Sequence, residues 1–295
     1  MSAEHSRPPN PTDTPSGSKR TMGSRWPAIL AYHAIARVAD DPNRICVSPR
    51  RFEAQMGFLK RRGLRGVSVR ELLRAGGPKG AKGLIGLTFD DGYDNFLHAA
   101  LPILERYGFS ATVFAIGGVL GAENTWDERP RMRLLGAEGI REAARRGMEV
   151  GSHGMSHIQL SGLRAEELEK EVVESRRILG EILDEAVEGF CYPYGSVDGA
   201  AAQSARGAGY TYACACWTRV ESSIYDFPRA PVWEIDGPLM LAAKLKVFPL
   251  YFELASAPMQ KAVDKVGRMV NGRVKQVARG LTDRPFSAKS PEKRI

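Results

Sequence analysis

A strand followed by a helix, repeated at least six times between residues 28 and 215, is the feature that most restricts how this chain can fold. Short apolar runs predict the strands, and apolar residues at helical spacing predict the helices between them. Such alternation predicts a parallel sheet, either open or closed into a distorted (β/α) barrel. We expect strands at 28–32, 67–69, 84–89, 111–116, 148–151, 190–194 and 211–215, and helices at 49–62, 137–146, 165–183 and 199–207. A further helix should begin after Ser68 as N-cap, and another should carry Phe96, Ala100 and Leu104.

The chain divides into four segments. Residues 1–26 are dense in proline, serine, threonine and arginine, and we expect a disordered arm. Residues 27–237 carry the alternation and should form the α/β domain. Residues 238–280 have valines at helical spacing with lysines and arginines on the other face, which predicts a basic amphipathic helical extension. Residues 281–295 should be a polar tail.

The formal net charge is +8 and the sequence pI is about 9.4. A basic chain favours anionic partners, but no nucleic-acid-reading motif accompanies the charge, so we expect no nucleic acid partner. A solvated basic surface is the simpler interpretation. Residues 261–279 are suited to peripheral contact with an anionic membrane, although such a helix more often packs on its parent domain.

Cysteine usage and the absence of long apolar runs bear on the compartment. The four cysteines, Cys46, Cys191, Cys214 and Cys216, form no CxxC pair and resemble buried thiols of a reducing compartment. The first 26 residues hold no apolar stretch typical of a secretory signal, and no run of about 18 apolar residues indicates a membrane span. We therefore expect a cytoplasmic protein, either free or peripheral to the inner face of the membrane.

Two short motifs carry most of the chemistry. Asp90 and Asp91 follow the apolar run 84–89, and His153 and His157 follow the run 148–151. In parallel α/β folds, the carboxyl ends of strands gather catalytic groups at one edge. One carboxylate and two imidazoles form a transition-metal ligand set with open positions, and the second carboxylate is placed to act as a base. The flanking glycines and serines suggest that the histidine motif is a turn opening into a helix.

The motifs TFDDGY at 88–93, SHGMSH at 152–157 and YPYG at 192–195 together resemble the polysaccharide deacetylase family, also called NodB-homology or carbohydrate esterase family 4. The resemblance covers about residues 28–233 and implies a distorted (β/α) barrel of about seven strands. It implies one divalent metal, Zn2+ first with Fe, Co or Ni as alternatives, and removal of N-acetyl groups from sugars. By position, Asp91, His153 and His157 would bind the metal, and Asp90 would be the general base.

Other roles follow from the same resemblance. Tyr194 would bind the oxyanion through its backbone N–H, and Tyr32 and Tyr93 are further candidates for oxyanion or substrate binding. Most members place the general acid on a late histidine, but this chain has no histidine after position 157. His33 takes that role by elimination and by resemblance to the branch of poly-N-acetylglucosamine deacetylases. A core histidine is the alternative.

Arg229 resembles the late Pro-Arg of that branch and could orient Asp90, although a structural salt bridge would also explain it. Trp126, Trp217 and Trp233 could stack on a sugar or lie in the core. The predicted function is metal-dependent N-deacetylation of a polysaccharide, a lipid-linked glycan or a nucleotide sugar. A deacetylase-like amidase on a non-sugar amide, a non-haem iron enzyme and a non-catalytic binding module stay as alternatives.

Overall fold

A parallel sheet forms the centre of the protein in the computed structural model, which describes residues 28–77, 79–216 and 223–254. Seven strands follow one another in the order β10, β1, β5, β6, β7, β8, β9, and β4 pairs with β5 outside this path. Every pairing in this sheet is parallel. The strands are β1 (Ile29–Tyr32), β4 (Arg65–Val67), β5 (Leu84–Phe89), β6 (Thr112–Ala115), β7 (Glu149–Ser152), β8 (Gly189–Cys191), β9 (Tyr212–Cys214) and β10 (Ala230–Pro231). The predicted parallel α/β architecture is confirmed.

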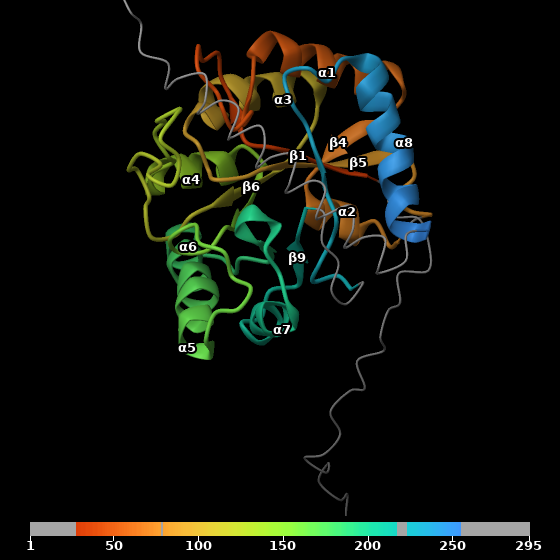
Figure 1. Cartoon of the computed structure of the whole chain (residues 1–295). Coiled ribbons are helices and arrows are strands. Elements are labelled where there is room, and N and C mark those ends of the chain that lie inside the picture. The colour runs from red at the N-terminus through yellow and green to blue at the C-terminus, as the bar shows by residue number, and fades with distance from the viewer. Residues whose placement is uncertain (1–27, 78, 217–222, 255–295) are drawn as a thin grey trace, which may run out of the picture.

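Helices flank the sheet on its outer side (Figure 1). A short second sheet pairs β2 (Ala34–Ile35) with β3 (Cys46–Val47) in parallel. The helical elements are α1 (Pro49–Arg61), α2 (Val69–Arg74), η1 (Phe96–Ala100), α3 (Leu101–Tyr107), α4 (Ala137–Arg145), α5 (Ala165–Leu168), η2 (Glu169–Glu174), α6 (Ser175–Leu183), η3 (Pro193–Gly195), α7 (Gly199–Gly207) and α8 (Pro238–Leu254). Elements η1 and η2 are π-helical, so each belongs to a longer helix with one wide turn.

The sheet curls into a half-barrel whose open side is bridged by the segment 224–231. On one side of this segment, the Phe227 N–H donates to Ala213 O over 2.9 Å, and the Ala215 N–H donates to Phe227 O over 2.8 Å. On its other side, β10 pairs with β1, with Ala230 opposite Leu30. The segment therefore joins β9 to β1 and completes the ring of hydrogen-bonded backbone.

Strand register brings the two chemical motifs to one rim. Tyr32 lies opposite Phe89 at the ends of β1 and β5, so the next residues of both strands, His33 and Asp90, leave the sheet side by side. Further along, Ser152 at the end of β7 is paired to β6 and to β8. The residues that follow these strands therefore emerge at the carboxyl edge of the sheet, as expected for parallel folds.

Most predicted elements agree with the structure to within two residues. Ser68 caps α2 as predicted, since its hydroxyl accepts from the Glu71 N–H at 3.1 Å. The strand predicted at 190–194 is shorter, because Pro193 has no N–H to donate and Tyr194 adopts a left-handed φ of 58°. The predicted turn into a helix after His153 is also wrong. That segment stays irregular until α5 begins at Ala165.

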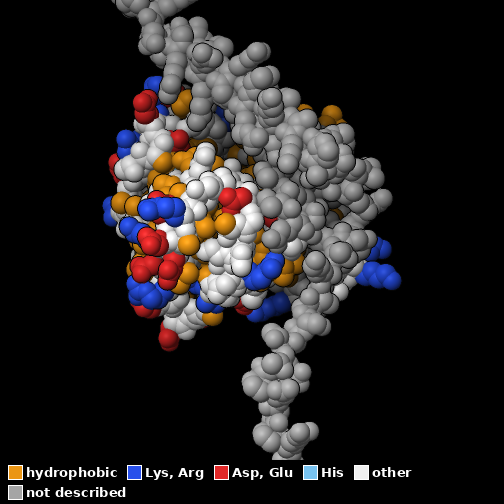
Figure 2. Space-filling view, turned by 60° about the horizontal axis from the view of Figure 1, so that its bottom comes forward, with side chains coloured by type: hydrophobic (Ala, Val, Ile, Leu, Met, Phe, Trp, Pro, Cys, Tyr) orange, Lys and Arg blue, Asp and Glu red, His pale blue; other side chains and the backbone are white. Residues whose placement is uncertain are grey.

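Much of the basic charge on the described surface is paired with acidic side chains. On α4, Arg145 contacts Glu138 and Glu142, and Arg146 contacts Glu105 of α3. Figure 2 shows Lys and Arg side chains adjoining Asp and Glu side chains over one face of the described protein. A mixed surface of this kind fits a solvated exterior better than a dedicated anion-binding face.

The chain ends lie partly outside the structural description. The described part of the predicted extension is α8, while the segments 1–26, 261–279 and 281–295 lie outside the described residues. Within the described ranges, none of the helices combines the length and the apolar character needed to cross a bilayer. The domain boundary at residue 237 stays a prediction.

Candidate metal and acid–base site

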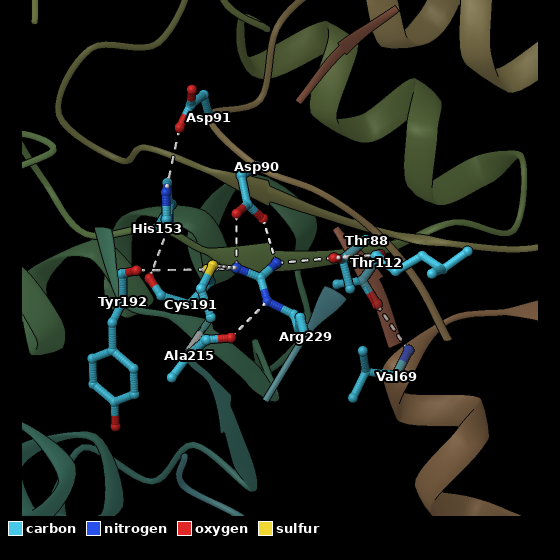
Figure 3. A network of polar contacts seen from close by, with 12 residues as sticks. Val69, Thr88, Asp90, Asp91, Thr112, His153, Cys191, Tyr192, Ala215 and Arg229 are labelled. Atoms are coloured by element: carbon cyan, nitrogen blue, oxygen red, sulfur yellow. Dashed lines mark hydrogen bonds and ion pairs between the residues drawn. The ribbon is translucent and has the colours of Figure 1, made fainter. Parts of the chain in front are cut away.

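Asp90 and Asp91 directly follow β5, and their side chains point in different directions (Figure 3). The Asp90 N–H donates to Tyr32 O at 2.9 Å, which extends the β1–β5 ladder by one residue. Asp91 then turns into the left-handed region with φ of 68°, and Gly92 follows with φ of 67°. A left-handed aspartate is uncommon and is held here by the surrounding structure, as is frequent at functional sites. The turn separates the two carboxylates into two environments.

Asp91, His153 and His157 bring three ligand atoms together. Asp91 Oδ1 lies 3.3 Å from His153 Nε2 and 3.1 Å from His157 Nε2. All three side chains are buried, and Asp91 Oδ1 has no hydrogen-bond partner among the described residues. Atoms that bind one ion at about 2.1 Å, with tetrahedral or octahedral angles, lie about 3.0–3.4 Å apart. The three atoms therefore fit a single small divalent cation, and Asp91 Oδ1 lacks a partner that such a cation would supply.

The histidine tautomers suit the same interpretation. His153 Nδ1 lies 2.7 Å from Cys191 O. Because a carbonyl oxygen only accepts, Nδ1 carries the proton and the lone pair of Nε2 faces Asp91. His157 adopts a φ of 57°, and its Nδ1 is buried without a partner in the described part of the chain. Burial alone would raise the pKa of Asp91, but the closeness of the His153 and His157 rings to its carboxylate holds that pKa well below its ordinary value.

Asp90 is held by a buried arginine. Arg229 is fully buried, and its guanidinium donates to Asp90 Oδ1 at 2.6 Å and to Asp90 Oδ2 at 2.8 Å. The remaining donors bond to Ala215 O, to Thr88 Oγ1 and to Cys191 Sγ (Figure 3). Burial would raise the pKa of Asp90, but the charge and hydrogen bonds of Arg229 lower it below the usual carboxylate range. Asp90 is therefore an oriented, ionised carboxylate beside the three-ligand cluster.

A second possible ligand cluster shares this neighbourhood. Asp90, His153 and Cys191 also bring potential ligand atoms within 4.8 Å of one another. The guanidinium of Arg229 lies 3.0 Å from Cys191 Sγ and 2.8 Å from Asp90 Oδ2, so a cationic side chain already occupies this position. Burial also raises the pKa of the Cys191 thiol well above its ordinary value, which disfavours the thiolate that a metal would need. Of the two clusters, only the first is therefore a candidate metal site.

His33 lies where the predicted acid should be. It follows β1 directly beside Asp90, it is half-buried, and its charge influences the pKa of both Asp90 and Asp91. The other described histidine outside the cluster, His98, is exposed on η1. Geometry thus brings His33 to the site, while its role as an acid stays a prediction.

The three tyrosine candidates have different positions. Tyr194 is 55% exposed, and its ring centroid lies 4.6 Å from that of His157, so it borders the cluster from the solvent side. Burial, Asp127 and Asp91 raise the pKa of Tyr194 to about 12. Tyr93 is buried next to the cluster, and burial together with Asp91 raises its pKa far above the usual value.

The structure contradicts the prediction that Tyr32 binds the oxyanion or the substrate. Its ring is fully buried and stacks on Phe89 with a centroid distance of 5.4 Å, and its hydroxyl donates to Gln55 at 3.1 Å. Successive residues of a strand point to opposite faces, so Tyr32 enters the core where His33 faces the rim. Tyr32 is therefore withdrawn as a candidate, because its ring packs in the core and its hydroxyl is already bonded to Gln55, whereas the Tyr93 hydroxyl has no partner among the described residues.

Of the three tryptophan candidates for sugar stacking, only Trp126 lies beside the cluster in the described part of the chain. The ring of Trp126 lies 4.3 Å from that of His157 at an interplanar angle of 31°, and its buried Nε1 has no partner among the described residues. Trp233 instead packs under Lys244, whose Nζ lies 4.1 Å from its ring centroid, and Trp217 lies outside the described residues.

Sequence reasoning missed Cys191, which contacts both His153 and Arg229. No motif marks it, because a backbone carbonyl has no sequence signature.

Comparisons with known proteins agree on one family. Residues 77–213 match the family model described as polysaccharide deacetylase. The chain is 28% identical over 200 residues to the putative polysaccharide deacetylase YxkH of Bacillus subtilis, covering 67% of each protein. It is 26% identical over 161 residues to a poly-beta-1,6-N-acetyl-D-glucosamine N-deacetylase of Staphylococcus aureus, covering 50% of this chain and 53% of that protein.

A solved structure extends the agreement to the fold. The deacetylase PplD of Streptococcus pyogenes, solved with acetate, superposes with a TM-score of 0.65 at 24% identity. The match covers 74% of this chain and 97% of that structure. At this identity the likeness concerns the architecture, and it agrees with the half-barrel described above.

Proposed function

We propose that this chain is a hydrolase of carbon–nitrogen bonds other than peptide bonds that removes N-acetyl groups from an N-acetylated sugar, as its match to the polysaccharide deacetylase family model and its deacetylase relatives support. One observation carries the proposal. Asp91 Oδ1 lies 3.1–3.3 Å from two histidine nitrogens, beside a second carboxylate that a buried arginine holds ionised. This pairing of a cation site with an adjacent base suits hydrolysis of an amide by water.

Asp91, His153 and His157 would hold the divalent cation, for which the mixed nitrogen and oxygen donor set favours Zn2+, with Fe, Co or Ni as alternatives. A cation bound there would supply a Lewis acid and would lower the pKa of water. The proton on His153 Nδ1 is bonded to Cys191 O, which keeps Nε2 available for the cation.

Asp90 would accept the proton of the attacking water. A general base must be ionised and fixed in direction, and the bidentate contact with Arg229 supports both properties. Arg229 does not face the substrate in this proposal, because all of its described contacts are internal and its side chain is fully buried. It is a positioning residue for the base.

His33 would donate a proton to the departing sugar nitrogen. It follows β1, the strand paired with the one that precedes Asp90, and it is half-buried, so a substrate could reach it from the rim. Tyr194 would bind the oxyanion through its backbone N–H, since this residue lies beside His157 at the edge of the cluster. Tyr93 stays a candidate for substrate binding.

The sugar would contact the aromatic rim. The Trp126 and Tyr194 rings flank His157, and Tyr194 is largely exposed, which suits stacking on a pyranose ring. The S. aureus relative acts on poly-beta-1,6-N-acetyl-D-glucosamine and a Sinorhizobium fredii relative is a chitooligosaccharide deacetylase, so oligomers of N-acetylglucosamine are the first substrates to test. The parallel α/β fold disfavours the non-haem iron alternative, whose enzymes usually have an all-β jelly roll.

The test is release of acetate from defined substrates by purified protein. We would compare chitooligosaccharides, β-1,6-linked N-acetylglucosamine oligomers and an acetyl-lysine peptide, using protein loaded with Zn2+, protein stripped with chelator, and the variant Asp90→Asn. We expect acetate from a sugar substrate, loss of release on stripping and loss in the variant. Release from the acetyl-lysine peptide alone would make the enzyme a non-sugar amidase. No release from any substrate by loaded protein would overturn the proposal and leave a binding module.

A further inference from the structure

A buried carboxylate outside the ligand cluster contacts the loop that carries both histidines. Glu171 is 3% exposed and belongs to the π-helical segment η2, in the middle of the helix that runs from residue 165 to residue 183. None of the roles considered above uses it. π-Helical turns are rare and frequently occur at functional sites, since the extra residue redirects side chains on one face of a helix.

Every described contact of the Glu171 carboxylate is with the loop between His153 and His157. Glu171 Oε2 accepts from the Met155 N–H at 2.8 Å and from the Ser156 N–H at 3.1 Å. Its other oxygen, Oε1, accepts from the Ser156 hydroxyl in a short hydrogen bond. Among the described residues, no lysine or arginine forms an ion pair with Glu171. The anion is therefore satisfied by three donors from one loop.

The loop depends on outside partners because it has no secondary structure of its own. Its carbonyls are bonded on the opposite side, where the Gly117 N–H donates to Gly154 O at 2.8 Å and the Gly118 N–H donates to Met155 O at 3.0 Å. The close approach requires glycine, since a Cβ on Gly118 would lie 2.3 Å from Met155 O. The N–H groups of the loop thus donate to Glu171, and the carbonyl oxygens of the loop accept from the N–H groups of Gly117 and Gly118.

The same helix also holds the start of the loop. The Ser152 hydroxyl, one residue before His153, donates to Ser175 Oγ at 2.8 Å, and the Ser175 hydroxyl donates to Glu171 O at 2.7 Å. The helix therefore contacts the end of β7 and the middle of the loop at once. Burying a charge without a countercharge costs stability relative to an apolar residue, so fold stability alone gives little reason for a carboxylate here.

From this geometry we propose that Glu171 is a positioning residue for metal binding. It holds residues 154–156 so that His153 Nε2 and His157 Nε2 face Asp91 Oδ1 before a cation arrives. The inference rests on the metal site of the proposed function and does not depend on which substrate is hydrolysed. Groups that orient metal ligands typically change metal affinity by about 10–100-fold when removed.

Three variants test the inference by metal affinity rather than activity. Glu171→Ala removes all three hydrogen bonds. Glu171→Gln keeps the shape, because the amide oxygen can accept from both backbone N–H groups while the amide NH2 donates to the Ser156 hydroxyl. Glu169→Ala, an exposed position of the same π-helical segment, controls for loss of a negative charge and for helix propensity.

The measurement is the dissociation constant for Zn2+ by competition with a chromophoric chelator, together with the Co2+ absorption spectrum and the Tm with and without metal. We expect Glu171→Ala to bind Zn2+ about 10–100-fold more weakly and to show an altered Co2+ spectrum. Glu171→Gln should stay within a few-fold of the wild type, and Glu169→Ala should match it. Should Glu171→Ala fail to fold, Ser156→Ala removes one of the three bonds and should still weaken Zn2+ binding several-fold.

A purely structural role would give a different result. Glu171→Ala would then lower the Tm equally with and without metal and leave the dissociation constant and the Co2+ spectrum unchanged, which would overturn the inference. Wild-type protein that binds no Zn2+ would overturn it together with the metal part of the proposed function. Wild-type protein that binds Zn2+ but releases no acetate would refute the proposed function alone, because the affinity comparison would still decide the role of Glu171.

Discussion

The buried Asp90–Arg229 pair gives the sharpest prediction about stability. Arg229 has five donors, and the structure provides acceptors for them on Asp90, Thr88, Ala215 and Cys191. In Arg229→Met, an apolar side chain fills the space and the Asp90 carboxylate stays buried without its partner. Removal of one member of a buried ion pair typically costs about 3–5 kcal/mol, because the remaining charge is uncompensated. We expect this loss in the free energy of unfolding at pH 7.

The sign of the pH dependence follows from the pKa of Asp90. Arg229 lowers that pKa in the folded protein, so the pair stabilises the wild type above the ordinary aspartate pKa of about 3.9 and the contribution is lost as the pH falls below it. In Arg229→Met, burial instead favours the protonated acid. The difference in stability between wild type and variant should therefore shrink on acidification, where Asp90 becomes neutral in both proteins.

The assay is urea unfolding followed by tryptophan fluorescence and far-UV circular dichroism at pH 7 and at a lower pH. The matched control is Arg146→Met, because Arg146 also forms two hydrogen bonds to one carboxylate, Glu105, but at the surface. Surface pairs contribute about 0–1 kcal/mol. The double variant Asp90→Asn with Arg229→Met should be less destabilised than the sum of the single changes, because it leaves no buried charge. A cost for Arg229→Met no larger than that for Arg146→Met would refute the assignment of a buried, desolvated pair.

The remaining predictions concern the reaction. Asp90→Asn should abolish measurable acetate release while bound Zn2+, measured by elemental analysis, stays at the wild-type level; loss of metal would mean that the two aspartates have exchanged roles. Asp91→Ala should lose the metal as well as activity, and a variant that keeps stoichiometric Zn2+ would remove Asp91 from the ligand set. His33→Ala should lower kcat by about 10²–10⁴-fold, the usual contribution of a general acid, with no change in metal content; near-normal kcat would place the acid elsewhere. Trp126→Ala should raise KM more than it lowers kcat if its ring stacks on the sugar, and an unchanged KM on oligomers would confine it to a structural role.

Local signals in the sequence were sufficient for most of the architecture. Ser68 could be identified as a cap because its position before an apolar helical stripe has a defined hydrogen-bonding consequence. The strand after Gly189 was predicted too long, since its aromatic residues favour a strand while Pro193 and the left-handed Tyr194 end it. The two motifs were placed on one rim correctly, because parallel strands direct their carboxyl ends to the same edge.

Contacts between distant segments were harder to foresee. The sequence does not indicate that Glu171 bonds to Met155 and Ser156, because that contact depends on a π-helical turn with no sequence signature. The histidine motif was expected to open into a helix, and His157 instead adopts a left-handed conformation in an irregular loop. Tyr32 was a candidate by proximity to His33, but strand alternation sends the two side chains to opposite faces.

The segment that bridges β9 and β1 has a consequence for how activity is lost. It contributes Arg229 to Asp90 and, two residues away, bonds to β9 through Phe227, so one stretch of backbone forms both the seam of the barrel and the support of the proposed base. Fraying of that seam would release the carboxylate while the remaining strands and the histidine loop were still in place. Such a protein would keep its cation and most of its secondary structure but would be inert, so catalysis would fail at a milder stress than folding does.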